Sequence, residues 1–216
     1  MDQLTVDALA KETKGGSGFK VLVIRRDGQL GNSFINNLSS IVARSELHEI
    51  WMWMREDSGR VHILESIQWK HLRELDIRLK AGTFETSVMR ILVDGVTKMS
   101  EKVELDIFSF LSEAQDNPLT LPEGDLLQTF VASTSIERLL LQVNMTLEQI
   151  LSLLRSADVT RMYSLTLWAK GFDSVKVDAI LDGLQHAKKL RRLVLRQSNI
   201  AEEQRSRMEA KGVSLI

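Results

Sequence analysis

Apolar residues recur along the chain in one repeated pattern, apolar-x-x-apolar-x-apolar, which is typical of short strands. Six segments carry the complete pattern, and a seventh, KVELDI (102–107), keeps only the last two apolar positions in phase. GVSLI (212–216) resembles a short eighth strand. The middle apolar residues of the seven segments lie 25 to 34 residues apart, which predicts a repeat architecture. The six complete copies are FKVLVI (19–24), LHEIWM (47–52), LRELDI (72–77), IERLLL (136–141), MYSLTL (162–167) and LRRLVL (190–195).

A second repeated element lies between these segments, with apolar residues three and four positions apart, as on one face of a helix. Its clearest stripes cover residues 34–42, 88–99, 147–154 and 177–184. Thr146 with Gln149 has capping-box spacing, and Asn199 with Glu202 resembles such a box before the last helix. The segment 116–124, which holds both prolines, is predicted to be a surface loop inserted in one unit.

Polar residues flank the central apolar position in several strands, as Glu74 and Asp76 flank Leu75. This alternation indicates that one sheet face packs on helices and the other meets solvent. Strands of a closed barrel are covered on both faces and read as continuous apolar runs. The sequence therefore predicts an α/β fold, an open horseshoe solenoid of seven to eight strand–helix units with a parallel sheet on its concave side. A closed (β/α)8 barrel is the alternative.

The segments LRELDI, IERLLLQVN, MYSLTLWAK and LRRLVLRQSN resemble the leucine-rich-repeat strand motif L-x-x-L-x-L-x-x-N. The helix in each unit makes the chain similar to the ribonuclease-inhibitor-like subfamily, and runs such as ILSLLRSADVTRMYSLTLWAKG are similar to fungal members. The motif's asparagine is in phase only at Asn144. The resemblance covers residues 19–216 and leaves 1–18 as an N-terminal cap or linker. It implies a leucine-rich-repeat horseshoe that recognises another protein.

Charge and cysteine content narrow the function classes. Lys and Arg number 28 against 29 Asp and Glu, so no basic excess points to nucleic acid or to an anionic membrane. The absence of cysteine excludes disulfides, thiolate metal sites and a cysteine nucleophile. The start of the chain does not resemble a signal peptide, and no apolar run reaches membrane-spanning length. We therefore expect a cytoplasmic protein, with the nucleus as the second location.

The sequence lacks the motifs of common enzyme classes. The glycine-rich stretch 14–18 precedes a strand, whereas a phosphate-binding loop follows a strand and opens a helix. The four histidines, at positions 48, 62, 71 and 186, have no HExxH spacing, and no G-x-S-x-G motif occurs. We expect no enzyme activity, no cofactor and no metal.

The residues on either side of each inward apolar position should point out of the concave face. Carboxylates dominate the second to fourth strands and arginines the last, with three of the four tryptophans among them. Trp and Arg are common interface anchors, although strands also hold aromatic residues through packing alone. The predicted partner-binding residues are Trp51, Trp53, Glu74, Asp76, Arg78, Glu104, Asp106, Phe108, Arg138, Trp168, Arg192 and Arg196.

Three functions are compatible with this pattern. The first is a non-enzymatic protein–protein interaction module. The second, by resemblance, is the substrate-recognition part of an F-box-type ubiquitin-ligase adaptor in a longer parent chain, because residues 1–18 are too few for an F-box. The third is a barrel enzyme. Terminal repeats expose their apolar cross-section, so self-association through the solenoid ends is a further expectation.

Overall fold

A computed structural model describes residues 20–26, 31–54, 57–79, 84–99, 101–112, 117–198 and 200–215. The predicted N-terminal segment 1–18 lies outside these residues. Eight parallel strands form one sheet in which each strand pairs with the next along the chain. The strands are β1 (Val21–Arg26), β2 (Glu49–Met54), β3 (Glu74–Leu79), β4 (Val103–Ser112), β5 (Thr134–Gln142), β6 (Ser164–Phe172), β7 (Arg192–Ser198) and β8 (Ser214–Leu215).

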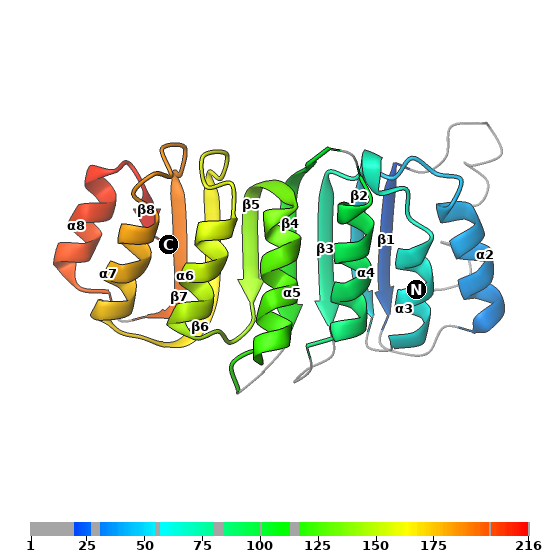
Figure 1. Ribbon diagram of the computed structural model, residues 1–216, viewed down its shortest axis with the longest axis horizontal. Coiled ribbons are helices and arrows are strands. Elements are labelled where there is room, and N and C mark those ends of the chain that lie inside the picture. The colour runs from blue at the N-terminus through cyan, green and yellow to red at the C-terminus, as the bar shows by residue number, and fades with distance from the viewer. Residues whose placement is uncertain are drawn as a thin grey trace.

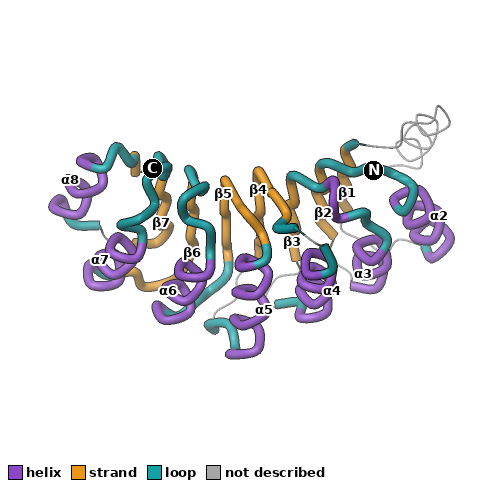
Figure 2. The backbone as a smooth tube through the Cα atoms, turned by 45° about the horizontal axis from the view of Figure 1, so that its top comes forward, coloured by secondary structure: helices purple, strands orange, loops and turns teal. Residues whose placement is uncertain are grey.

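Helices connect successive strands and all lie on one side of the sheet (Figure 1). Figure 2 shows these helices following an arc outside the strands, so the sheet lines the inner side of the curve. They are α2 (Asn32–Val42), α3 (Asp57–Glu65), α4 (Thr86–Thr97), α5 (Leu121–Ala132), α6 (Leu147–Ser156), α7 (Ser174–Gly183) and α8 (Glu202–Ala210), with a 3-10 turn, η2 (Trp69–His71).

The two ends of the sheet lie at opposite ends of the molecule (Figure 1). Within the described residues β1 pairs only with β2, and β8 pairs only with β7. The sheet is therefore open. The closed barrel that the sequence left as an alternative is wrong.

Strand register aligns the apolar residues into two rows that face the helices. The first row runs from Leu22 in β1 to Leu193 in β7, and the second from Ile24 to Leu195. Most of these side chains are fully buried and form the main core with the apolar faces of the helices. The first row is Leu22, Ile50, Leu75, Phe108, Leu139, Leu165 and Leu193, and the second is Ile24, Met52, Ile77, Phe110, Leu141, Leu167 and Leu195.

Strand β4 differs from its prediction by three residues. Leu75 pairs with Phe108, although the sequence pattern had placed Leu105 at this central position. The complete apolar pattern is LDIFSF (105–110), in which Leu105 is the first apolar residue. Phe108 packs against Phe130 of α5 with ring centroids 4.5 Å apart. The Phe108 side chain therefore lies in the core and fills the space between the sheet and α5.

Helix α5 occupies part of the segment predicted to be a loop. The helix begins at Leu121, and the Thr120 backbone N–H donates to the Glu123 carboxylate at 2.7 Å. Pro122 fits this first turn because the first helical N–H groups have no partner within the helix. The loop prediction for 116–124 is thus wrong over its last four residues.

Capping glutamines join neighbouring units. The predicted capping box of α6 is confirmed, because Gln149 Oε1 accepts from the Thr146 N–H at 3.0 Å and Thr146 Oγ1 accepts from the Gln149 N–H at 3.2 Å. Gln149 Nε2 also donates to the Leu119 carbonyl, just ahead of α5, at 2.7 Å. One side chain thus caps its own helix and binds the preceding unit.

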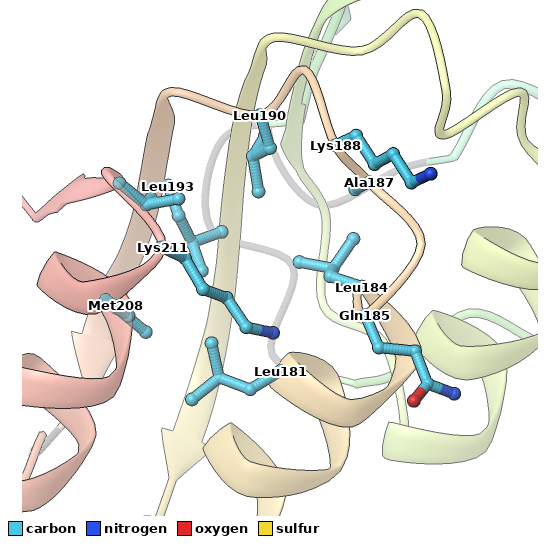
Figure 3. A pocket seen from close by; sticks show the side chains of 10 residues that line it. Leu181, Leu184, Gln185, Ala187, Lys188, Leu190, Leu193, Met208 and Lys211 are labelled. Carbon is cyan, nitrogen blue, oxygen red and sulfur yellow. The ribbon is translucent and has the colours of Figure 1, made fainter.

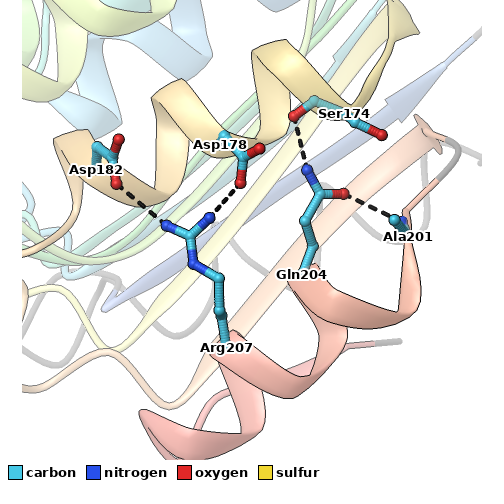
Figure 4. Close-up of polar contacts among 6 residues, drawn as sticks. All are labelled: Ser174, Asp178, Asp182, Ala201, Gln204 and Arg207. Carbon is cyan, nitrogen blue, oxygen red and sulfur yellow. Dashed lines mark hydrogen bonds and ion pairs between the residues drawn. The ribbon is translucent and has the colours of Figure 1, made fainter.

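The same arrangement recurs at α8 (Figure 4). Gln204 accepts from the Ala201 N–H at 3.1 Å and donates to the Ser174 carbonyl of α7 at 2.6 Å. The predicted capping pair of Asn199 and Glu202 is wrong, because Ala201 caps α8 and Glu202 is its first helical residue. Asn199 itself lies outside the described residues. Arg207 adds ion pairs to Asp178 and Asp182 of α7. These contacts fix the spacing of the last two helices.

A buried ion pair links α3 to α4. Arg60 Nη1 lies 2.8 Å from Glu85 Oε2, and the two side chains are only 0% and 6% exposed. Arg60 Nη1 also lies 3.4 Å from the Arg78 carbonyl of β3. Burying either charge without the other is costly, so the pair acts as one structural unit.

We expect Arg60→Met alone to lower the free energy of unfolding by about 3–5 kcal/mol, because Glu85 would remain as an uncompensated buried charge. The double variant Arg60→Met/Glu85→Leu should be clearly more stable than the single variant, since no charge is then left behind. Urea unfolding followed by circular dichroism measures both. Equal stability of the single and double variants would contradict this coupling.

Trp69 packs directly on the backbone of α4. A Cβ added at Gly95 would lie 2.4 Å from two atoms of the Trp69 ring. Glycine is unfavourable within a helix by about 1 kcal/mol relative to alanine. Its presence here therefore follows from the close approach of the indole.

Gly95→Ala should lower the free energy of unfolding by about 1–3 kcal/mol, because the new methyl group overlaps Trp69. Gly183→Ala is the matched control, since its Cβ would meet the nearest atom at an ordinary 3.5 Å. This control should stay neutral or become more stable. In a Trp69→Leu background the penalty at Gly95 should disappear, and thermal melts of the four proteins check the cycle.

Candidate functional site

The sheet face turned away from the helices, here named the open face, carries three rows of side chains. Strand pairing defines the rows, since residues two apart point to the same side. The first row is Val21, Glu49, Glu74, Ile107, Arg138, Ser164, Arg192 and Ser214; the second is Val23, Trp51, Asp76, Ser109, Leu140, Thr166 and Val194; the third contains Arg25, Trp53, Arg78, Leu111 and Gln142, with Trp168 paired to Arg196.

Nine of the twelve predicted partner-binding residues lie in these rows. The exceptions all belong to β4, because its register was predicted three residues early. Phe108 is completely buried, while Glu104 and Asp106 lie exposed near the start of the strand, ahead of the rows. Glu104 forms an ion pair with Arg161 at 2.7 Å. The residues that β4 contributes instead are Ile107, Ser109 and Leu111. The acidic part of the open face is therefore confined to β2 and β3.

An arginine from each neighbouring strand lies against the Trp53 ring. Arg25 Cζ is 4.1 Å from a ring centroid, and Arg78 Cζ is 4.2 Å from it. Both arginines are exposed, whereas Trp53 is partly buried between them. Such contacts attract a cation to the negative face of the ring. Trp53 thus holds two guanidinium groups at the carboxyl end of β1 and β3.

A weaker version of this contact occurs near the other end of the sheet. Arg196 Cζ of β7 lies 5.2 Å from the Trp168 ring of β6. Trp168 is partly buried and Arg196 is exposed. Tryptophan beside arginine therefore recurs in the third row.

Three carboxylates lie together on β2 and β3. Glu49 and Glu74 are direct neighbours in the first row, and Asp76 follows in the second. Partial burial raises the pKa of Glu74, and the adjacent Glu49 charge raises it further, while Trp51 acts in the opposite direction. Burial also raises the pKa of Asp76, while the Trp53 indole and the Ser109 hydroxyl act to lower it.

The polar atoms of this region are incompletely paired within the described part of the chain. None of the three carboxylates takes part in an ion pair there. The indole nitrogens of Trp51 and Trp53 approach the carboxylates without reaching hydrogen-bond geometry, and Asp76 Oδ1 is also buried without a partner. Unpaired buried polar atoms cost free energy, so these groups weaken the folded state.

Two depressions are lined by residues outside the three rows. An apolar cavity of about 180 Å³ lies between α7 and α8. Figure 3 shows Leu181, Leu190 and Met208 in its wall, with Lys188 and Lys211 beside them. A shallow groove at the amino ends of β2–β4 is lined by mixed charges, among them His48, His71, Lys98 and Glu104. Neither brings acids, bases and a nucleophile into one arrangement.

Two features are absent from the residues that the structure describes. In that part of the chain, no three His, Asp or Glu side chains gather in a way that could hold a metal ion. No helix there has the length and apolar character needed to cross a membrane. Neither a protein-family model nor a curated protein sequence matches this chain. The open face is therefore the basis for proposing a function.

Asp76→Asn should stabilise the protein most at neutral pH, because the wild-type carboxylate is held in a partly buried position. Its folded-state pKa is raised above 3.8, so its ionisation opposes folding, and that cost disappears once the group is protonated in both states. The stability difference between variant and wild type should therefore be absent below about pH 4 and grow as the pH rises through the folded-state pKa. Thermal melts from pH 3 to pH 8 measure this difference, and a pH-independent offset would contradict it.

Proposed function

We propose that this chain is a leucine-rich-repeat solenoid of the ribonuclease-inhibitor-like type, and that it works as a non-enzymatic module binding a protein partner on its open face. The sequential parallel strands, the helices on one side and the recurring apolar motif support this assignment. The observation that carries the function is the position of Trp51, Trp53 and Trp168 on the open face, with arginines beside two of them.

The composition of the open face supports protein binding. Its 22 row residues include five arginines and three tryptophans but no lysine, although the chain contains 12 lysines. Protein interfaces are enriched in aromatic residues and arginine and depleted in lysine, because arginine and tryptophan bury large areas at modest entropic cost. A face selected only for solubility would favour lysine, because its ammonium group is more strongly hydrated than the guanidinium group of arginine.

The apolar members of the rows strengthen this argument. Ile107, Leu111 and Leu140 are partly exposed in the centre of the sheet, between the charged groups of β2–β3 and those of β7. An apolar centre with a polar surround is the usual anatomy of a specific interface. The curved sheet brings these groups to the inner side of the arc (Figure 2).

The test is affinity capture from a lysate of the source organism with wild type and a Trp51→Ala/Trp53→Ala/Trp168→Ala variant, followed by cross-linking to map the contact. Each anchor should contribute about 2 kcal/mol or more, roughly 30-fold in affinity, so the variant should lose a partner that wild type retains. Circular dichroism must first show that the variant is folded.

Leu121→Ser/Val175→Ser is the matched control, because both side chains are more than 70% exposed on the helix side. It should retain the partner as wild type does. A partner held equally by all three proteins, or lost only from the control, would contradict binding through the open face.

A further inference from the structure

We propose that Arg25 and Arg78, held by Trp53, form a site for an acidic side chain of the partner, and that Glu49, Glu74 and Asp76 bind a basic side chain of the same partner. This inference rests on the proposed function and specifies the chemistry of the partner. The occupant is one surface segment of a protein that carries its two opposite charges at a fixed separation.

The two guanidinium groups lie against one indole, from the strands on either side of Trp53, and are positioned before any partner arrives. Their Cζ atoms are at most about 8 Å apart, because each lies within 4.2 Å of the same ring. Two like charges at this distance repel each other, and an anion near both removes that repulsion. The ring also restricts both side chains, so less conformational entropy is lost when their N–H groups bind a carboxylate.

A protein side chain fits this site better than a nucleic acid. The Arg25 and Arg78 side chains lie against the Trp53 ring, which bases would need for stacking. The three nearby carboxylates would also repel a continuous phosphate backbone. A protein segment can place a single anion on the arginines and a single cation on the carboxylates.

The register sets the separation between the two charges. On β2, Glu49 and Trp53 are four residues apart, as are Glu74 and Arg78 on β3, which corresponds to about 13 Å along a strand. Asp76 lies between the two rows, next to Trp51. A partner with both charges of one sign would meet repulsion at one of the two sites, so this spacing provides specificity.

A peptide titration tests the proposal without the natural partner. The probe is acetyl-Lys-Val-Thr-Val-Asp-amide, added into the millimolar range to ¹⁵N-labelled full-length protein while the Trp indole and Arg Nε–H signals are followed by NMR. Saturable shifts of the Trp53, Arg25 and Arg78 signals are expected. A peptide with Gln and Asn in place of Lys and Asp, and an isomer with Lys and Asp adjacent, should each bind at least tenfold more weakly.

Arg78→Lys is the decisive variant, because it keeps the charge but loses the planar fork and the stacking on Trp53. It should weaken binding of the probe at least fivefold, while Arg90→Lys, an exposed position of α4, leaves it unchanged. Equal binding of all three peptides, equal binding by Arg78→Lys, or no saturable shift would overturn the proposal.

The outcomes separate this inference from the proposed function. If tryptophan-dependent capture succeeds and the peptide test fails, the open face binds its partner by other chemistry. If the peptide binds with the expected spacing and no protein is captured, the charge-recognition site stands and the proposed function loses its support.

Discussion

Every described helix lies on one side of the sheet because of the way parallel strands must be connected. A connection between adjacent parallel strands crosses over the sheet and is almost always right-handed. When each strand pairs with the next in sequence, all crossovers fall on the same face, and the order β1 to β8 meets this condition. The two apolar rows that include Leu75 and Ile77 are buried on that side. Within the described part of the chain, no helix therefore covers the opposite face.

The uncovered face is not optimised for stability alone. Glu49 and Glu74 are adjacent like charges, and burial raises the pKa of both Glu74 and Asp76. Like-charge neighbours and partly buried carboxylates both weaken the folded state. Functional sites commonly retain such unfavourable groups because binding requires them. These energetic costs distinguish the β2–β3 region from a surface that is merely solvated.

Sequence reasoning succeeded where local pattern determines structure and failed where a distant contact does. The alternation of apolar and polar residues and the repeat period were sufficient to place β1–β3 and β5–β7. In β4 they were ambiguous, because Leu105 is buried in either register, and only pairing of Phe108 with Leu75 in β3 and Leu139 in β5 resolves it. Helix α5 had a local signal in Thr120 and Glu123, which was overlooked. Helix α3 had no such local signal, because Arg60 interrupts its buried side and Glu85, which neutralises Arg60, lies 25 residues further along.

The three-residue correction in β4 changes the chemistry of the candidate site as well as its geometry. At their predicted positions, Glu104 and Asp106 would have extended the acidic region of the open face over β2, β3 and β4. With Ile107, Ser109 and Leu111 in their place, the carboxylates are followed on the next strand by residues without charge. The arginines beside Trp53 lie at the carboxyl ends of β1 and β3, on either side of β2. In the proposed site, opposite charges about 13 Å apart, with an uncharged strand alongside, would distinguish partners by the spacing of their charges and not only by their net charge.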